Sequence, residues 1–202
     1  MIKKIGYGIF AFLCVSIGLY PLIYFIFERT FGLLGSKSLE LLTDNVWNIA
    51  FYTHIFLGGL ALGIGWLQFN KKLRNKRIKL HKRVGYIYLI SAYLSGFASL
   101  YIGYHATGGI VAALGFICLG IVWLTTTYLA FNAIKNKQIK EHQKWMIYSY
   151  AACFAAVTLR IWLPILMALF ETFNEGYRIV AWLCWMPNII VAYFIVKRLK
   201  LN

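Results

Sequence analysis

Four histidines are the residues of this sequence best suited to chemistry, and each lies in or beside a long apolar run: His54, His81, His105 and His142. Imidazole nitrogens are common metal ligands, and histidines on facing helices can hold a haem iron inside a helical bundle. Polar side chains within apolar runs are costly to bury and usually have a function. The four histidines are therefore candidate metal or haem ligands.

His54 begins a face of small residues. If its apolar run is helical, the residues His54, Gly58, Ala61, Gly65 and Gln68 follow one another at steps of four, three, four and three and share one face. A ring nitrogen above a strip of small residues leaves room for a flat molecule, so this face predicts a cofactor site. The alternative is a histidine that only hydrogen-bonds to a neighbouring helix.

The other three histidines lie near the ends of apolar runs. His81 and His142 stand at the start of two such runs, in basic segments, and His105 follows a third in a glycine-rich turn. His81 has Gly85 one turn later, as His54 has Gly58. Three cations near His81 are candidates to contact haem propionates: Lys79, Lys82 and Arg83. Simple solvation is the alternative for all three histidines.

The elements that must position these residues are membrane-spanning helices. Of the 202 residues, 61% are hydrophobic and only 13% are charged, whereas soluble domains carry about 25% charged residues. A helix needs roughly 20 apolar residues to cross a bilayer. We expect an all-α polytopic bundle, a single transmembrane domain over residues 1–202, with six transmembrane helices at about 5–27, 46–69, 84–104, 109–132, 145–169 and 179–197.

The basic residues predict how this bundle is oriented. Of the 21 Lys and Arg residues, 17 fall on one side of the predicted spans, and the other side has only Arg29, Lys37 and Arg178. Basic loops face the cytoplasm, so both termini are expected there, in a bacterial inner membrane. The net charge of +15 is then explained by topology and by contact with anionic lipids. A nucleic-acid partner is not needed to explain it.

Depth sorts the histidines into two levels. His81 and His142 share the inner level, whereas His54 and His105 lie on the outer side. The inner end of the His54 helix is ~22 Å from that histidine at 1.5 Å per residue. One metal cannot bind all four, so we expect an inner haem between His81 and His142 and an outer haem on His54, with His105 as its second ligand.

Arg160 is the only charged residue deep inside a predicted span. It follows His142 by 18 residues, five helical turns, so a continuous helix would place both on one face. A buried arginine needs an anionic or carbonyl partner. Candidate partners are an outer-loop carboxylate such as Glu171 or Asp44, backbone carbonyls, a haem propionate or a quinone carbonyl. The alternative is an arginine that extends outward to the membrane surface.

Several local signals predict how the helices begin, pack and bend. Gly59 and Gly63 form a small-xxx-small step for close helix packing, to which the fourth span adds Gly115 and Gly120. Residues 38–42 are expected to form a short surface helix, and Asp44 or Asn45 to cap the second span. Three prolines lie inside spans, where kinks are tolerated: Pro21, Pro164 and Pro187.

The succession HIxxGGLALxxGxxQF, LHKRVG and EHQKWM…TLR resembles an uncharacterised group of bacterial membrane proteins that share a domain of unknown function. The resemblance covers about residues 50–165. It implies that the following residues belong to the pattern of the family: His54, Gln68, His81, Gly85, Gly109, Gly115, Phe116, His142, Trp145, Met146 and Arg160. The family more often has arginine at Lys82, Gln143 and Tyr148, and His105 is not clearly part of its pattern. Its similarity to two-haem cytochrome b bundles is architectural and supplies no activity.

These observations favour a b-type cytochrome-like membrane protein that binds haem b and transfers electrons. The sequence leaves open whether it is also an oxidoreductase linked to a quinone or metal. A quinone and a redox partner are the expected partners. One alternative is a non-enzymatic protein that handles a metal ion or assists assembly. Another is a carrier that binds a small anionic substrate through Arg160 and His54. No nucleotide-binding or hydrolase motif is present in the sequence.

Overall fold

The structure is a computed structural model that describes residues 2–28 and 32–201. Arg29 lies outside this range, as do the side chains of Lys3 and Lys4. Every regular element of the described residues is helical. Six described segments are long and apolar enough to cross a membrane: Ile5–Phe25, Asn45–Phe69, Ile78–Tyr104, Ile110–Lys135, Ile139–Leu169 and Phe173–Arg198. The prediction of an all-helical, six-span membrane protein is therefore confirmed.

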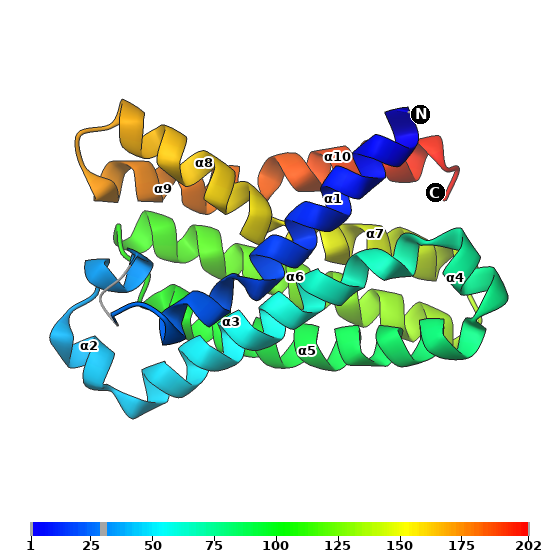
Figure 1. The fold of residues 1–202 in the computed structure, drawn as a ribbon, viewed down its shortest axis with the longest axis horizontal. Coiled ribbons are helices and arrows are strands. Elements are labelled where there is room, and N and C mark those ends of the chain that lie inside the picture. The colour runs from blue at the N-terminus through cyan, green and yellow to red at the C-terminus, as the bar shows by residue number, and fades with distance from the viewer. Residues whose placement is uncertain (1, 29–31, 202) are drawn as a thin grey trace. The chain divides into compact units, whose positions relative to one another are not determined.

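The chain folds as two compact units, residues 1–95 and residues 96–202. Figure 1 labels the helices of both units and colours them from blue at the N-terminus to red at the C-terminus. The first unit contains α1 (Ile2–Leu19), η1 (Tyr20–Phe25), η2 (Gly32–Ser36), α2 (Leu39–Thr43), α3 (Asn45–Gly65), η3 (Trp66–Phe69), α4 (Lys71–Lys76) and the beginning of α5 (Ile78–Tyr104). The second contains the end of α5, then α6 (Ile110–Lys135), α7 (Ile139–Cys153), α8 (Ala155–Leu169), α9 (Phe173–Leu183) and α10 (Met186–Arg198).

In the first unit, α1 packs against α3 through glycines (Figure 1). A Cβ atom built on Gly18 would lie 2.7 Å from the carbonyl oxygen of Gly59 and 3.1 Å from Cα of Gly63. A Cβ on Gly59 would lie 2.5 Å from the carbonyl oxygen of Gly18. Backbones this close exclude larger residues at the crossing. The predicted small-xxx-small step therefore lies at the contact with α1, and Gly59 is its residue that must lack a side chain.

Polar caps fix the starts of the helices in the first unit. The Ser38 hydroxyl accepts from the Leu41 N–H at 3.3 Å and caps α2. The Asp44 carboxylate accepts from the Val46 N–H at 2.8 Å and caps α3. The side-chain oxygen of Asn70 accepts from two N–H groups of α4. The short helix predicted at residues 38–42 and the predicted Asp44 cap are both confirmed.

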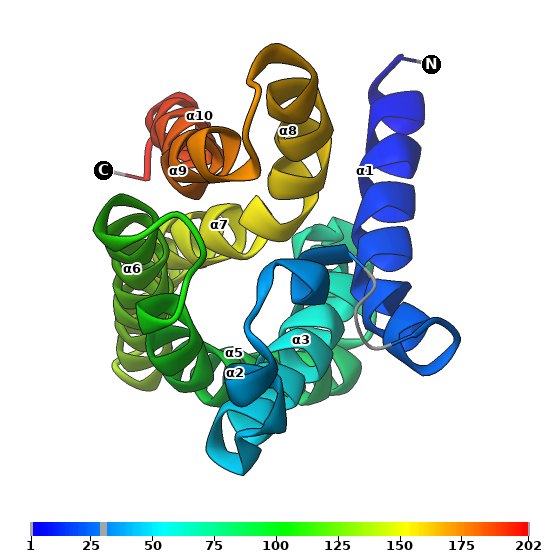
Figure 2. The ribbon, with the colours of Figure 1, turned by 90° about the vertical axis from the view of Figure 1, so that its left-hand side faces the viewer.

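In the second unit, the last two spans are each divided into two helices. The fifth is interrupted at Phe154, between α7 and α8, and the sixth at Cys184 and Trp185, between α9 and α10. Figures 1 and 2 show the chain changing direction between α7 and α8. The spans predicted at 145–169 and 179–197 are present, but the sequence analysis did not predict where each is broken. Pro187 lies in the first turn of α10, but no proline or glycine marks the break at Phe154.

The break at Phe154 corrects the predicted relationship between His142 and Arg160. His142 lies in α7 and Arg160 in α8, so a single helical face does not connect them. The argument from five turns assumed one continuous helix from His142 to Arg160. In the structure α7 ends at Cys153 and α8 begins at Ala155. Shared periodicity places two residues on one face only while the helix continues.

Two helices begin earlier than predicted. The third and fifth spans were expected to start at residues 84 and 145, whereas α5 begins at Ile78 and α7 at Ile139. His81 and His142 therefore lie inside helices, not in the segments before them. The basic side chains of these first turns are mostly exposed, and long cationic side chains can extend from a helix toward water while the helix continues.

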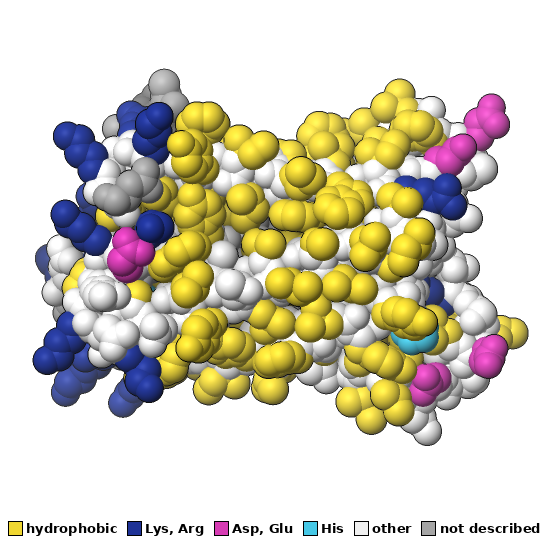
Figure 3. Space-filling model, turned by 180° about the vertical axis from the view of Figure 1, so that it is seen from behind, with side chains coloured by type: hydrophobic (Ala, Val, Ile, Leu, Met, Phe, Trp, Pro, Cys, Tyr) yellow, Lys and Arg dark blue, Asp and Glu magenta, His cyan; other side chains and the backbone are white. Residues whose placement is uncertain are grey.

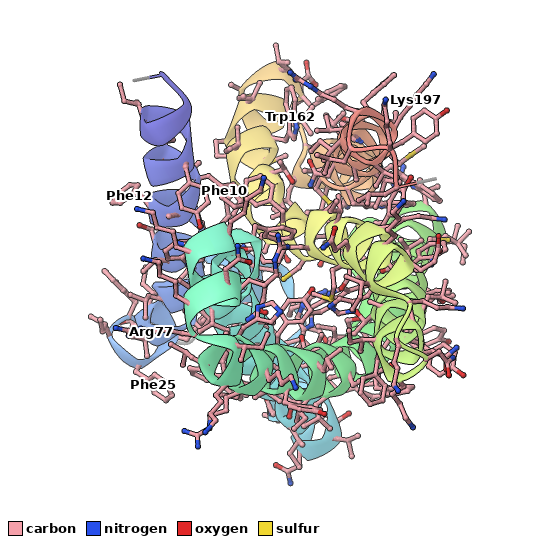
Figure 4. The ribbon with its side chains drawn as sticks, turned by 90° about the vertical axis from the view of Figure 1, so that its right-hand side faces the viewer. Phe10, Phe12, Phe25, Arg77, Trp162 and Lys197 are labelled. Atoms are coloured by element: carbon pink, nitrogen blue, oxygen red, sulfur yellow. The ribbon has the colours of Figure 1, made fainter. Side chains whose placement is uncertain are left out.

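The surface of the helices is apolar along their length. Figure 3 shows hydrophobic side chains along the helices on the face it draws, with Lys and Arg side chains gathered at helix ends. Phe12 and Phe25 are 69% and 72% exposed and point outward from their helices (Figure 4). Large apolar side chains on this scale indicate contact with lipid acyl chains.

Candidate functional site

His54 on α3 contacts the backbone of α5 at Ser95. Its Nδ1 atom lies 3.1 Å from the Ser95 carbonyl oxygen and 3.1 Å from the Ser95 hydroxyl oxygen. The same hydroxyl donates to the carbonyl oxygen of His54 at 2.9 Å. Two residues 41 positions apart in the chain are thereby joined by hydrogen bonds in both directions.

These contacts determine which ring nitrogen of His54 carries the proton. A carbonyl oxygen can only accept, and the Ser95 hydroxyl proton is already directed at the His54 carbonyl. Both contacts at Nδ1 therefore require an Nδ1–H donor. The neutral ring then has its lone pair on Nε2, the nitrogen used by a metal-ligating histidine whose other nitrogen donates to a carbonyl.

His142 on α7 makes the corresponding contact with α6. Its Nδ1 lies 2.8 Å from the carbonyl oxygen of Ala130. Two turns along α7, the Ser149 hydroxyl is 2.7 Å from the Thr127 hydroxyl, also between these helices. Nδ1 must again be the protonated nitrogen, so His142 presents its lone pair at Nε2. The sequence identified both histidines without indicating that they share this bonding pattern.

The small-residue face of α3 packs against α5 at both of its ends. A Cβ atom on Gly58 would lie 2.9 Å from the Ser95 hydroxyl oxygen. Near the other end of the strip, Oε1 of Gln68 lies 3.6 Å from the position of a Cβ on Gly85. The absence of a side chain at Gly58 thus permits close approach of two helices. A ligand-binding role for Gly58 and Gly85 stays a prediction.

The two α5 residues that meet this strip, Gly85 and Ser95, belong to a row of residues at helical spacing. His81, Gly85, Tyr88, Ala92 and Ser95 are separated by four, three, four and three positions, and the last three are buried. This face was not recognised in the sequence, because α5 was expected to begin after His81. The detectable signal was the row of serines at positions 91, 95 and 99 within an apolar run.

His105 and Arg160 have less specific surroundings. The His105 ring lies with its centroid 5.2 Å from those of both Tyr101 and Tyr104, and its side chain is half-buried. Arg160 donates from Nη1 to the carbonyl oxygen of Ala156 at 2.8 Å, one turn earlier on α8. A backbone carbonyl is thus one partner of this arginine, as the sequence analysis allowed.

His54 and His81 belong to the first unit, and His105 and His142 to the second. Both haem pairings stay predictions. Within the described residues, no group of three or more His, Cys, Asp or Glu side chains is placed to hold a metal ion. Axial ligation of haem iron needs only two such ligands, so histidine pairs remain the relevant donor set.

A second polar cluster in the second unit was missed by the sequence analysis. Asn188 Nδ2 lies 3.0 Å from the Thr158 hydroxyl, 3.0 Å from the Cys184 carbonyl oxygen and 3.3 Å from the Ala151 carbonyl oxygen. The Thr158 hydroxyl also donates to the Cys184 carbonyl. The cluster connects the two helix breaks, because Ala151 lies just before the first and Cys184 lies in the second.

The comparison with known families identifies the type of protein. A family model described as "Predicted membrane protein (DUF2306)" matches residues 51–196. The chain belongs to this family. The match includes the four histidines, Gln68 and Arg160, and it begins inside α3, after the first span. It confirms the resemblance to an uncharacterised family of multi-span membrane proteins. Neither a curated protein nor a solved structure matches the chain.

Proposed function

We propose that this protein binds haem b through histidines on facing helices and transfers electrons within the membrane. The supporting observation is the shared state of His54 and His142, which both donate from Nδ1 to a backbone carbonyl of a neighbouring helix. This bond fixes the orientation and tautomer of each ring and raises the basicity of Nε2. A histidine that only joined two helices could donate from either ring nitrogen, so the use of Nδ1 by both residues is not required by packing alone.

The donor set fits haem in its chemistry. Nε2 of His54 and Nε2 of His142 would each ligate iron, and His81 and His105 are the proposed second ligands. The helices around the ligands supply an apolar environment that excludes water. Bound haem supplies one-electron transfer, with a potential set by its ligands and their hydrogen bonds. Arg160, on a helix of the second unit, is proposed to neutralise a propionate or to donate to a quinone carbonyl.

The test is the absorption spectrum of detergent-purified protein from cells supplied with a haem precursor, recorded oxidised and dithionite-reduced. We expect a Soret band that His142→Ala and His54→Ala each reduce. Added imidazole should restore part of the lost band, because it replaces the missing nitrogen without repairing the fold. Ser95→Ala is the matched control, since it leaves the Ser95 carbonyl in place for Nδ1 of His54.

Two outcomes would contradict the proposal. The absence of haem at any stoichiometry would exclude cytochrome function and leave metal handling by histidine as the alternative. A band that survives in both histidine variants would assign the haem to other residues. Identical loss in the two variants would indicate one shared site in place of two.

The proposed orientation places both termini on the cytoplasmic side of a bacterial inner membrane. It is supported by the excess of basic residues after α3, around the junction of α6 and α7, and at the end of α10. A cysteine added at either terminus should resist a membrane-impermeant maleimide in intact cells and react after lysis. A cysteine placed in the segment between η2 and α2 should react without lysis. The opposite pattern would reverse the topology.

A further inference from the structure

The side chain of Gln68 is exceptional among the polar groups at the end of the α3 span. It lies in η3 and is only 9% exposed, yet its Nε2 atom has no hydrogen-bond partner among the described residues. Its neighbours are satisfied: Trp66 donates its indole N–H to the Gly63 carbonyl at 2.8 Å, and the Asn70 side chain caps α4. A buried amide donor without an acceptor is costly and needs an explanation.

A glycine of α5 lies beside this amide. Gly65 precedes Gln68 by three positions on α3, and Gly85 faces it from α5. A Cβ on Gly85 would touch nothing within 4 Å except Oε1 of Gln68, at 3.6 Å. This contrasts with Gly58, where a Cβ would meet the Ser95 hydroxyl at 2.9 Å. Gly85 therefore leaves a gap beside Oε1 of the amide whose Nε2 has no partner, and a methyl group would fit there without a clash.

The surroundings select a neutral acceptor. The first two cations that follow Gln68 in sequence, Lys71 and Lys72, are exposed, whereas the amide is buried. A carboxylate or phosphate beside the amide would be a buried charge without a buried counter-charge, which is unfavourable. A carbonyl oxygen carries no net charge and accepts directly from an amide N–H. It is the acceptor that best matches this site.

The depth of Gln68 indicates where such a carbonyl would come from. η3 ends the membrane-spanning segment Asn45–Phe69, and the basic helix α4 follows at once. Gln68 is thus expected at the boundary between acyl chains and headgroups. We propose that the Gln68 amide donates a hydrogen bond to a carbonyl oxygen of a molecule entering from the bilayer. The two sources of this chemistry are a quinone ring and a lipid acyl ester. The proposal does not depend on haem binding.

The experiment measures the thermal-unfolding midpoint of the full-length protein in a maltoside detergent, which has no carbonyl group. Three additions are compared: a short-chain quinone, a diacyl phospholipid and the diether analogue of that phospholipid. We expect the quinone or the diacyl lipid to raise the midpoint, and the diether lipid to have no effect. A rise with the quinone identifies the ring carbonyl as acceptor, and a rise confined to the diacyl lipid identifies the ester.

Two variants connect any rise to the amide. Gln68→Met keeps the length of the side chain without its donor, so it should raise the ligand-free midpoint and abolish the rise with ligand. Gly85→Ala should fill the gap, leaving the ligand-free midpoint equal or higher and again abolishing the rise. Gln143→Met, on α7 in the other unit, is the matched control and should retain the rise.

Three results would overturn the proposal. They are no rise with any additive, a rise that persists in Gln68→Met, and equal rises with diacyl and diether lipid, which would indicate a headgroup contact. The Soret band of each sample is recorded beside its midpoint. Loss of the rise with an unchanged Soret band separates this site from the proposed haem ligands.

Discussion

Ser95 and His54 hold α5 and α3 together by hydrogen bonds in opposite directions: the Ser95 hydroxyl donates to the His54 carbonyl, and Nδ1 of His54 donates to Ser95. Gly58 lies one turn beyond His54, where a Cβ would come within 2.9 Å of the same hydroxyl. One serine thus determines both the state of the histidine ring and how close the helices approach. The two effects can be separated by substitution.

Gly58→Ala should destabilise the protein by about 1–3 kcal/mol, because its Cβ overpacks against the Ser95 hydroxyl. Ser95→Ala should cost about 0.5–1.5 kcal/mol, because it removes one hydrogen bond and leaves the His54 carbonyl to its helical partner. The double variant should be more stable than the sum of the two changes predicts, because without the Ser95 hydroxyl the new Cβ at position 58 has nothing to clash with. The measurement is a double-mutant cycle of unfolding free energies in detergent. Strict additivity would show that Gly58 is required for another reason.

The α1–α3 crossing provides a matched pair of glycine substitutions. Gly59→Ala should destabilise the protein by about 1–3 kcal/mol, because its Cβ would come within 2.5 Å of the Gly18 carbonyl and 3.3 Å of Pro21. Gly63→Ala should be neutral or slightly stabilising, because a Cβ there meets nothing within 4 Å and alanine favours helix. Thermal unfolding followed by circular dichroism compares them. Equal effects of the two variants would refute the close approach of α1 to Gly59.

The elements that the sequence predicted well are those set by local chemistry. Long apolar runs fix the six spans, Asp44 supplies an acceptor for the first turn of α3, and Gly59 permits the α1 crossing. Each of these features depends on residue type within one segment or on side-chain size. They could therefore be inferred before any partner segment was known.

The features that the sequence did not reveal depend on what lies opposite a residue. Periodicity places His54 and Gly58 on one face of α3, but a small-residue face suits a neighbouring helix as well as a flat ligand, and α5 meets it at Ser95. The helix break at Phe154 has no proline or glycine, and Asn188 donates to the Ala151 carbonyl and the Thr158 hydroxyl on either side of it. Such contacts between distant segments leave no signal in the composition of either segment.

Lys37 predicts a pH dependence of stability outside the membrane spans. Burial lowers the pKa of Lys37 from its ordinary value of 10.5 to about 8. Below pH 8 the folded protein holds a charged, partly desolvated ammonium, which opposes folding. Between about pH 8 and 10.5 the unfolded chain binds this proton and the folded protein does not, so the Lys37 contribution to stability rises with pH.

The difference between wild type and Lys37→Met isolates this contribution from those of other titrating groups. The variant should be the more stable protein at pH 7, and its advantage should shrink as the pH rises above 8. Unfolding free energies at a series of pH values provide the measurement, with Lys200→Met as a control at an exposed position. A difference that stays constant from about pH 7 to 10.5 would show that Lys37 titrates normally.

Asn188 should be essential for the helix breaks of the last two spans. Its amide is placed to donate to the carbonyls of Ala151 and Cys184 and to the Thr158 hydroxyl, at 3.0 to 3.3 Å. Asn188→Leu keeps the approximate volume but removes both donors, so the Ala151 carbonyl loses this partner and the Cys184 carbonyl keeps only the Thr158 hydroxyl of the cluster. The expected cost is about 1–3 kcal/mol of unfolding free energy. Asn188→Asp should cost more, because a carboxylate cannot donate and would face carbonyl oxygens.

The control for Asn188 is Asn136→Leu, which changes an exposed asparagine at the end of α6 and should leave stability within about 0.5 kcal/mol. Hydrogen exchange gives a second measurement of the same effect. Amide N–H groups next to the breaks at Phe154 and Cys184 should exchange faster in Asn188→Leu, whereas those of α3 should be unchanged, because α3 belongs to the other unit. Faster exchange throughout both units would show that Asn188 stabilises the whole fold and has no specific role at the breaks.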